Sequence, residues 1–186
     1  MVGGWYAAWV SFDVVVAADL EWGIGKDSGL PWPRLRADLA HFKAITSTAS
    51  EGRRNAIAMG RKTWESKEVA GRPLPRRVNI VISRRALVVP EGVIAATSLD
   101  DALAHRGDAE AMFVVGGAEI FRGAFAHPAL RWVYLTRVAG RFGCDTHIPD
   151  LDADFTTDAA WPAADHEDGG VRFRIERLRR RGGEAT

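Results

Sequence analysis

Residues 55–64, NAIAMGRKTW, contain a short apolar run that ends in a glycine and continues directly into a basic segment able to open a helix. The same order recurs at 111–125, where AMFVVGG is followed by AEIFRGAF. Apolar runs of about four to eight residues are typical of buried strands. Because strands that alternate with helices usually pair in parallel, these two stretches predict an α/β fold with a largely parallel sheet.

Other segments fit the same alternation. Apolar strands are expected at FDVVVAA (12–18), VNIVIS (78–83), GVIAA (92–96), WVYLTRV (132–138) and VRFRIERL (171–178). Ser98 is a suitable N-cap for a helix over LDDALAHR, because its hydroxyl can accept a hydrogen bond from a free N–H group of the first turn. The segment 142–170 is rich in Asp and Pro, so it is expected to be mostly loop.

Composition narrows the functional classes. The chain has 186 residues, with 25 basic against 24 acidic side chains and a net charge of +1, which argues against a nucleic-acid partner. Its single cysteine, Cys144, excludes an intrachain disulfide, and no apolar run reaches the ~18 residues of a membrane span. The start lacks the features of a signal peptide, so a cytoplasmic location without a membrane partner is expected.

Both ends of the chain are expected to be peripheral. The opening MVGGWYAAWVSFD carries Trp5, Tyr6 and Trp9, which are predicted to pack onto the surface. A basic run before GGEAT is predicted to be a solvated tail; it consists of Arg177, Arg179, Arg180 and Arg181. Neither end is assigned a function.

The stretch GLPWPRLRADLAHFK (29–43) places an acid on an apolar stripe. Pro31 and Pro33 stiffen the entry of a helix expected to begin near Arg34. Its buried face is predicted from residues at helical spacing, Leu35, Leu39, Phe42 and Ile45. Asp38 falls on that face, where an unpaired carboxylate costs several kcal/mol. Two explanations stay open: an acid favoured by the helix dipole, or an acid that serves a ligand.

Three predicted strands end in residues suited to phosphate. Gly60 precedes Arg61, Lys62 and Thr63, Ser83 precedes Arg84 and Arg85, and Gly116 and Gly117 open the helix after the third strand. In open α/β sheets ligands gather at the carboxyl ends of the strands, where free N–H groups favour anions. Each signal alone also fits an ordinary turn or a solvated basic residue. Three on one edge predict a polyphosphate ligand, and the basic residues favour NADP over NAD.

The other sequence motifs either exclude a functional class or allow two interpretations. The loop WGIGKDSG (22–29) has the wrong glycine spacing for the dinucleotide fingerprint, and it is either a flexible surface connection or a lid. The five histidines are scattered without an HExxH pair, so no metal site is expected. A GxSxG elbow and a P-loop are also missing from the sequence, so nucleophilic hydrolysis and kinase chemistry have no support.

Taken together, these segments resemble dihydrofolate reductase from about Phe12 to Arg177. The matching blocks, in the family's order, are VAADLEWGIGKDSGLPW, LRADLAHFK, MGRKTWES, RPLPRRVNIVISR, FVVGGAEIF, YLTRV and CDTHIPD. The resemblance implies a single α/β domain over 12–179 with a central, mostly parallel β-sheet, an antiparallel C-terminal strand and about four flanking helices. Residues 1–11 would be an extension and 180–186 a tail. It further implies NADPH-dependent reduction of 7,8-dihydrofolate to tetrahydrofolate by a cytoplasmic enzyme, expected to be a monomer.

The resemblance also gives the acid on the stripe a role. Asp38 matches the acid that holds the pteridine ring through its 2-amino group and N3 and that favours protonation of N5, while a hydride passes from C4 of NADPH to C6. Thr136 matches the threonine that hydrogen-bonds this acid, and Trp32 the tryptophan that fixes a pocket water. Without the family match, Thr136 is a strand threonine chosen for β propensity.

Other binding residues follow from the resemblance position by position. Arg77 matches the arginine that pairs with the α-carboxylate of the substrate's glutamate. Substrate contacts are matched by Val16, Ala17, Leu30, Leu39, Phe42, Phe121 and, through its backbone carbonyl, Val115. NADPH contacts are matched by Ala17, Ile24, Gly25, Gly60, Arg61, Lys62, Thr63, Ser83, Arg84, Gly116, Gly117, Ala118, Glu119 and Ile120.

The sequence departs from the family's pattern at three positions. Phe121 replaces a tyrosine whose hydroxyl lies near the nicotinamide and the pterin. Arg76 replaces a glycine before the substrate arginine, so that turn is expected to adopt a shape that non-glycine residues tolerate. Lys67 falls near a usually apolar substrate contact, which Val69 in a shifted loop can replace.

Two other functions compete with this one. The reductase of riboflavin biosynthesis shares the fold and NADPH but acts on a ribosyl-aminopyrimidine, and Asp38 and Arg77 argue against it. A non-catalytic NADPH-binding module is favoured only by Phe121, and the presence of Asp38, Trp32 and Thr136 outweighs that substitution.

Overall fold

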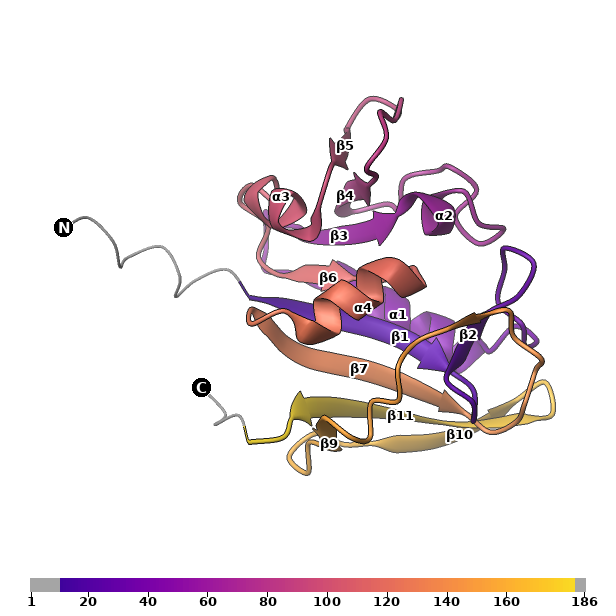
Figure 1. Cartoon of the computed structure of the whole chain (residues 1–186). Helices are drawn as coiled ribbons and strands as arrows, with labels where there is room; N and C mark the ends of the chain where they lie inside the picture. Colours follow the sequence, from indigo (N-terminus) through magenta and orange to yellow (C-terminus); the bar gives the residue numbers. More distant parts are fainter. Residues whose placement is uncertain (1–10, 183–186) are drawn as a thin grey trace.

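The computed structural model describes residues 11–182, which form a central twisted sheet with helices on both faces (Figure 1). The parallel part of the sheet consists of β1 (Phe12–Ala18), β3 (Asn55–Gly60), β4 (Arg77–Ile82), β5 (Val93–Ala96), β6 (Met112–Val114) and β7 (Leu130–Val138). The antiparallel part consists of β9 (Phe155–Thr157), β10 (Ala164–Asp168) and β11 (Val171–Arg180). The predicted α/β domain with a mostly parallel sheet is confirmed.

The order of the strands sets which loops meet. It runs β10-β11-β7-β1-β6-β3-β4-β5, with β9 paired to β11. β7, β1, β6, β3, β4 and β5 pair in parallel, so their carboxyl ends share one edge of the sheet. β11 turns antiparallel beside β7, as predicted for the C-terminal strand. All three predicted anion-binding strand ends therefore lie along that shared edge.

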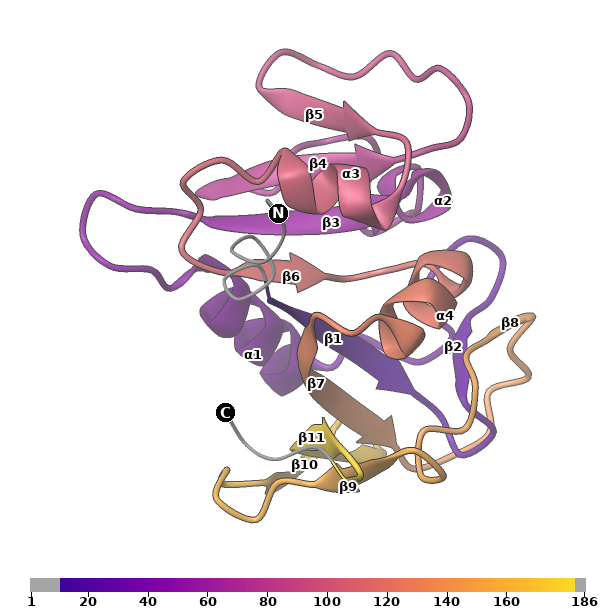
Figure 2. The same cartoon turned by 60° about the vertical axis from the view of Figure 1, so that its left-hand side comes forward.

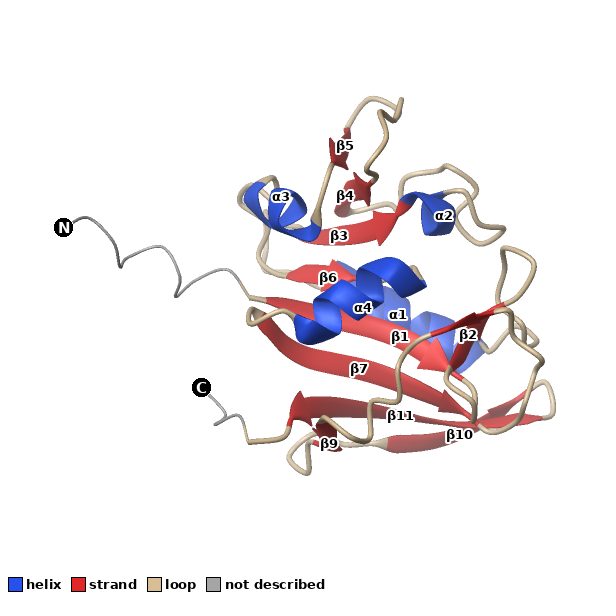
Figure 3. Ribbon diagram, in the orientation of Figure 1, coloured by secondary structure: helices blue, strands red, loops and turns tan. Residues whose placement is uncertain are grey.

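Four helices are described: α1 (Arg36–Ser47), α2 (Arg61–Trp64), α3 (Leu99–Ala104) and α4 (Ala118–Ala126). α1 lies on one face of the sheet, whereas α3 and α4 lie on the other (Figures 1 and 2). Ser98 caps α3 as predicted, because its hydroxyl accepts from the N–H of Asp101 at 3.0 Å. Figure 3 shows α2 at the edge toward which the arrowheads of β1, β3 and β7 point.

The alternation of β1 divides the core between the two faces. Val14 and Val16 pack into a cluster that includes Phe121 and Phe125 of α4, while Ala17 packs with Trp32 and other residues near α1. Burying one such aliphatic side chain stabilises the fold by about 1.5–3 kcal/mol. β1 is therefore packed on both of its faces, so the carboxyl end of the strand keeps a fixed position beside the site.

One expectation about α1 was wrong. The helix itself, expected from about Arg34, begins at Arg36, because Leu35 is still extended, with φ −91° and ψ 103°. The apolar stripe was expected to be buried, yet Leu39, Phe42 and Ile45 are only half-buried, and Thr46 is the buried residue of the helix. Apolar surface on this stripe therefore remains in reach of solvent around Asp38.

The segment 142–170 was expected to be mostly loop, but it contains β9, β10 and the short strand β8 (Thr146–His147). β8 pairs antiparallel with β2 (Gly23–Gly25), which begins the glycine-rich loop. β10 has the sequence ADHED and none of the apolar alternation that marks a strand, so its pairing with β11 was not visible from pattern.

The basic run was expected to be a solvated tail; Arg179, Arg180 and Arg181 are exposed as expected, but the prediction of a tail was wrong. β11 runs to Arg180, so three of the four arginines belong to the sheet. The guanidinium of Arg177 lies 4.0 Å from the ring centroid of Trp132 and forms an ion pair with Asp158. Arg180 donates to the carbonyl of Phe125 at 2.7 Å. The predictions for Trp5, Tyr6 and Trp9 fall outside the described residues, and the domain limits at 11 and 179 stay predictions.

Candidate active site

Asp38 lies in the first turn of α1, over the neighbouring strands β1 and β7. The hydroxyl of Thr136 on β7 donates to its Oδ1 at 2.6 Å. Thr136 is in register with Ala17 of β1 on one side and with Ile175 of β11 on the other. Burial raises the pKa of the Asp38 carboxyl, the hydrogen bond from Thr136 lowers it, and burial prevails. The result is a desolvated acid held by one neutral donor.

The surroundings of Asp38 are apolar. Trp32 is 6% exposed and meets the ring of Phe142 edge-on, with 5.8 Å between centroids. Ala17 and Leu35 belong to the same hydrophobic cluster as Trp32. Within residues 11–182 the buried indole N–H of Trp32 has no hydrogen-bond partner. These apolar residues lower the local dielectric constant, so they strengthen any electrostatic contact that a ligand makes with Asp38 or with the N–H group of Trp32.

Arg77 provides a buried cation at the other end of α1. It is 7% exposed, and its Nη1 donates to the hydroxyl of Thr46 at 2.7 Å. Its guanidinium lies 5.9 Å from the centroid of Phe42, and it forms no ion pair with a described acid. Burial lowers the pKa of Arg77, and the neighbouring Arg76 lowers it further. Arg77 is therefore a desolvated cation without a counter-charge from the described part of the chain.

Sequence reasoning missed Thr46 and misjudged Arg76. Thr46 lies one helical turn after Phe42, and its hydroxyl also donates to the Phe42 carbonyl at 2.7 Å. Arg76 has φ 63°, in the left-handed region that non-glycine residues rarely adopt, so the expected relaxed turn is wrong. Its side chain reaches Ser47 at 3.4 Å. The strained turn places Arg77 at the start of β4, directly beside α1.

The glycines at the carboxyl ends of β3 and β6 meet one another. The N–H of Gly60 donates to the carbonyl of Gly116 at 2.7 Å. A Cβ on Gly116 would lie 2.6 Å from Oγ1 of Thr63, and a Cβ on Gly60 would lie 3.0 Å from Ile120. Gly117 is the N-cap of α4 and supplies no side-chain cap. The two strand ends thus form a narrow floor where backbone N–H groups, a hydroxyl and a helix N-terminus gather.

Basic residues flank this floor. Arg84, after β4, forms an ion pair with Glu119 of α4 at 2.9 Å, which connects the third strand end to the other two. Arg61 pairs with Glu65 at 2.7 Å. Both pairs are largely exposed, so each contributes about 0–1 kcal/mol and yields readily to a bound anion. A recess of about 130 Å³ beside them is lined by Ser83, Arg84, Arg85, Ala86, Leu87, Ala95, Ala96 and Thr97.

The glycine-rich loop (22–29) lies beside the carboxyl ends of the parallel strands. Ile24 packs against the core, and Gly25 accepts from the N–H of Asp145 at 3.1 Å. Leu30 is 41% exposed, and its N–H donates to Glu68 at 2.8 Å. The N–H of Asp27 donates to the Asp145 carboxylate at 2.9 Å. The loop is therefore hydrogen-bonded to two other segments rather than being a free connection.

Other candidate residues lie in the core or on the surface around this grouping. Leu39 borders a surface depression of about 620 Å³ with Arg34, Arg36, Ala40 and Lys43. Phe121 is buried and stacks on Phe125, with centroids 5.8 Å apart. Val16 is a core residue, Lys62 is exposed, and Val115 bonds through its N–H to Ala58. These positions support the edge or line its margins.

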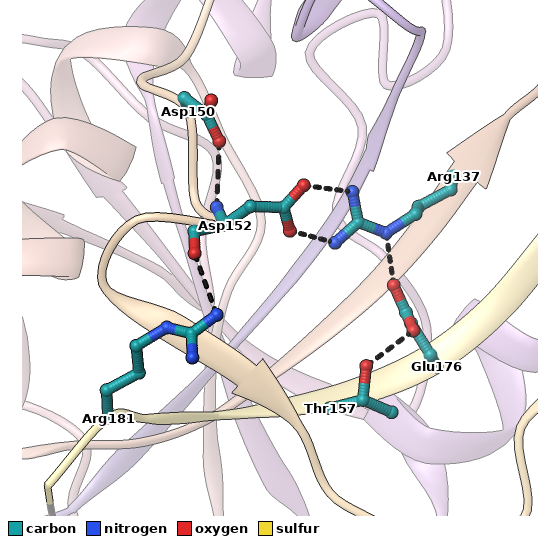
Figure 4. A network of polar contacts seen from close by, with 6 residues as sticks. All are labelled: Arg137, Asp150, Asp152, Thr157, Glu176 and Arg181. Carbon is teal, nitrogen blue, oxygen red and sulfur yellow. Dashed lines mark hydrogen bonds and ion pairs between the residues drawn. The ribbon is translucent and has the colours of Figure 1, made fainter.

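A polar network on the opposite side of β7 fixes the strand that carries Thr136. Figure 4 shows Arg137 between Asp152 and Glu176, with which it forms ion pairs. Thr157 of β9 donates to Glu176 at 3.0 Å, and the guanidinium of Arg137 lies 5.1 Å from the ring of Trp22. β7, β9, β11 and the base of the glycine-rich loop are thereby connected, so Thr136 has little freedom to move relative to β1.

Within residues 11–182, none of the helices combines the length and apolarity needed to traverse a bilayer.

Comparison with known proteins converges on one family. A family profile described as "Dihydrofolate reductase" matches residues 11–180. Dihydrofolate reductase of Gallus gallus is 37% identical over 178 residues, covering 89% of this chain and 94% of that protein. The bifunctional dihydrofolate reductase-thymidylate synthase of Glycine max is 42% identical over 161 residues, 81% of this chain but 30% of that protein. The structure of Schistosoma mansoni dihydrofolate reductase has a TM-score of 0.77 at 31% identity and covers 91% of this chain and 97% of that one.

Proposed function

The chain belongs to the dihydrofolate reductase family, and from that premise we propose that it reduces 7,8-dihydrofolate to tetrahydrofolate with NADPH as the hydride donor. Reduction adds a hydride to C6 and a proton to N5 of the pteridine ring. The observation that carries the proposal is Asp38, a desolvated carboxylate with one neutral hydrogen-bond donor beside a glycine-lined edge. Perturbed acids in such positions are candidates for catalysis.

Asp38 is suited to hold a flat heterocycle that carries adjacent N–H groups. The hydroxyl of Thr136 donates to Oδ1 of Asp38, and no described residue donates to Oδ2 of Asp38. The carboxylate can accept from the 2-amino group and N3 of the pteridine ring, and its charge favours the substrate protonated at N5. The available indole N–H of Trp32 orients a water molecule near the acid. In this apolar pocket both effects are stronger than they are in water.

Arg77 is suited to the acidic end of the same substrate. Its guanidinium is buried without a described acid, so a ligand carboxylate supplies the missing counter-charge and can bind it in bidentate fashion. Eight residues of α1 separate Asp38 from Thr46, the partner of Arg77, which is about 12 Å along a helix. One elongated ligand can therefore contact both groups, with its middle over the half-buried Phe42.

The strand ends fit a dinucleotide with an extra phosphate. A Cβ on Gly116 or Gly117 would lie 2.6 or 3.1 Å from Oγ1 of Thr63, so glycine is needed for the backbone to approach this closely, and the N-terminus of α4 favours a diphosphate. Arg61 and Arg84 are our candidates to hold the 2′-phosphate, because both are largely exposed cations beside these strand ends. NADPH bound there supplies the hydride that reaches C6 of the substrate. The chain's own residues align the cofactor and keep water from it.

The test of the function is the loss of NADPH absorbance when dihydrofolate is added, with Asp38→Asn as the critical variant. We expect turnover by the wild type and a loss of about 10²- to 10³-fold in kcat/KM for Asp38→Asn at pH 7, because the charge that favours the protonated substrate is gone. Asp108→Asn, at an exposed position, is the matched control and keeps wild-type turnover. Equal turnover by Asp38→Asn and the wild type would remove Asp38 from the reaction.

The cofactor assignment has a separate test. The double substitution Arg61→Ala with Arg84→Ala is expected to raise the KM for NADPH at least tenfold while leaving the KM for NADH unchanged, because NADH has no 2′-phosphate. NADH thus serves as the internal control. Unchanged KM for NADPH would exclude these arginines as the phosphate site. The cytoplasmic location and the monomeric state stay predictions.

A further inference from the structure

The helix that carries Asp38 receives its N-terminal cap from a distant strand. The N-cap position of α1 is Leu35, whose side chain accepts no hydrogen bond. The N–H of Arg36 instead donates to Oδ2 of Asp168, a residue 132 positions later at the end of β10. A carboxylate at a helix N-terminus satisfies a free N–H group and is favoured by the helix dipole. The cap of α1 is thus a tertiary contact.

The turn after Asp168 is shaped for this contact. Gly169 and Gly170 connect β10 to β11 with φ 59° and 76°, values that glycine adopts readily. A Cβ on Gly169 would lie 3.4 Å from Cβ of Pro33, so the turn packs against the proline that precedes α1. The hairpin therefore touches both the entry of the helix and its first N–H group.

The same hairpin also holds the partner of Asp38. β11 pairs with β7, and Ile175 of β11 is opposite Thr136 in the register. β10 is paired residue by residue with β11, with Asp168 opposite Val171. One side of the hairpin thus fixes the hydroxyl that donates to Asp38, and the other fixes the helix turn on which Asp38 stands. The 2.6 Å bond between Thr136 and Asp38 closes this loop of contacts.

We propose that Asp168 is a positioning residue for dihydrofolate reduction: its carboxylate caps α1 and so sets the position of Asp38 relative to Thr136 and the pteridine ring. The inference rests on the proposed function. Asp168 acts through the helix and does not touch the substrate. Without the cap, the first turn of α1 frays, and Asp38 spends part of its time away from the geometry that binds the ring.

The experiment compares Asp168→Ala with Asp168→Asn, which keeps a side-chain oxygen able to cap. Asp168→Ala is expected to raise the KM for dihydrofolate about five-fold, the effect of a typical cap, and to leave the KM for NADPH unchanged. Asp168→Asn is expected to stay within about two-fold of the wild type. Asp165→Ala, three residues earlier on β10 and paired only with Arg174, is the matched control and changes neither constant.

Two further measurements separate positioning from general stability. In the Asp38→Asn background, Asp168→Ala is expected to have no additional effect on the KM for dihydrofolate, because the group being positioned is gone. Asp168→Leu, similar in shape to aspartate, replaces Asp168→Ala if that variant does not fold. An unchanged KM for dihydrofolate in Asp168→Ala and in Asp168→Leu would overturn the inference. A rise in the KM for NADPH as large as the rise in the KM for dihydrofolate would also overturn it. In either case the proposed function stands. A wild type without turnover would instead refute the proposed function.

Discussion

Two aspartates near the carboxyl end of β1 meet opposite environments. Asp19 follows the strand, and its carboxylate accepts from the N–H groups of Glu21, Gly23 and Phe142 at 2.9, 2.9 and 3.1 Å. Asp38 stands over the same strand end and accepts one hydrogen bond, from the hydroxyl of Thr136. The first acid is saturated by the backbone, and the second retains an unused oxygen.

The two pKa values move in opposite directions. Burial raises the pKa of Asp19, but the hydrogen bonds from Phe142, Glu21 and Gly23 outweigh it and leave the pKa below 3.8. Burial also raises the pKa of Asp38, and the single bond from Thr136 does not outweigh it. Burial and the Asp19 carboxylate raise the pKa of Cys144 to about 11, so this thiol stays protonated at neutral pH. A saturated acid organises the fold, whereas an undersaturated, desolvated acid is available to a ligand.

Neutralising each acid in turn tests whether Asp19 stabilises the fold and Asp38 does not. Asp19→Asn is expected to lower the free energy of unfolding at pH 7 by about 2–3 kcal/mol, because charge-assisted bonds at the base of the glycine-rich loop are lost. Asp38→Asn is expected to raise it by up to about 1 kcal/mol, because a desolvated charge disappears. Urea denaturation of both variants measures the difference.

The two substitutions are expected to depend on pH in opposite ways. The lowered pKa of Asp19 stabilises the fold at pH values above 3.8, and that contribution is lost as the pH falls through the pKa of the folded state. The cost of Asp19→Asn therefore shrinks in acid. The raised pKa of Asp38 destabilises the fold increasingly as the pH rises from 3.8 through its folded value, so the gain from Asp38→Asn grows toward neutral pH. Parallel pH profiles for the two variants would contradict the contrast.

Arg77 extends the comparison to a cation. Arg77→Gln is expected to raise the KM for dihydrofolate about 10- to 30-fold, or about 2 kcal/mol, with the KM for NADPH unchanged, because a carboxylate of the substrate loses its partner. Steady-state kinetics with each substrate varied separately provide the measurement. Arg53→Gln, at an exposed position, is the control. A change confined to NADPH would assign Arg77 to the other half of the site.

Thr136→Val removes the one donor of Asp38 while keeping the shape of the side chain. Because the hydrogen bond lowers the pKa of Asp38, its loss is expected to raise that pKa further, with a fall of about five-fold in kcat/KM. Carbon-13 NMR titration of the aspartate carboxyls, assigned with Asp38→Asn, reports the pKa. Thr157→Val, which removes a donor from Glu176 instead, is expected to leave the Asp38 resonance in place.

The smallest expected effect concerns the strained turn before Arg77. Arg76→Gly is expected to raise the free energy of unfolding by about 1 kcal/mol, because glycine adopts φ 63° without the steric cost of a Cβ. Thermal unfolding measures the gain. Arg72→Gly, an exposed residue without a positive φ, is expected to lower stability through its greater backbone entropy. A loss of stability in Arg76→Gly would show that the side-chain contact with Ser47 outweighs the strain.

The buried strands of the sheet could be read directly from the sequence. β1 and β3 begin and end at the predicted residues, because most of their side chains are buried and only Asp13 and Asn55 interrupt the apolar sequence. β2, β8, β9 and β10 were missed, since short polar strands depend on a partner rather than on their own pattern. Leu39 and Ile45 were placed too deep because helical periodicity says which residues share a face but not how far a neighbour covers it.

The candidate site divides in the same way. Asp38 and the glycines at 116 and 117 are visible in the sequence as an acid on an apolar stripe and a flexible pair before a helix. Arg77 is identified only through the family resemblance, because the sequence pattern places it in a connector ahead of the strand. The partners that define their chemistry, Thr46 for Arg77 and Asp168 for α1, are ordinary residues in the sequence. They lie 31 and 132 positions from the residues they contact.

The buried strands, the edge at which they end and the residue types found there follow from the amino-acid sequence alone, because apolar periodicity and backbone propensity act over neighbouring residues. The solvation and the partners of each charge follow instead from the folded arrangement. Desolvation and hydrogen bonding depend on groups brought close by strand order and helix packing. The strain at Arg76, the saturation of Asp19 and the lone donor of Asp38 are all settled at that level.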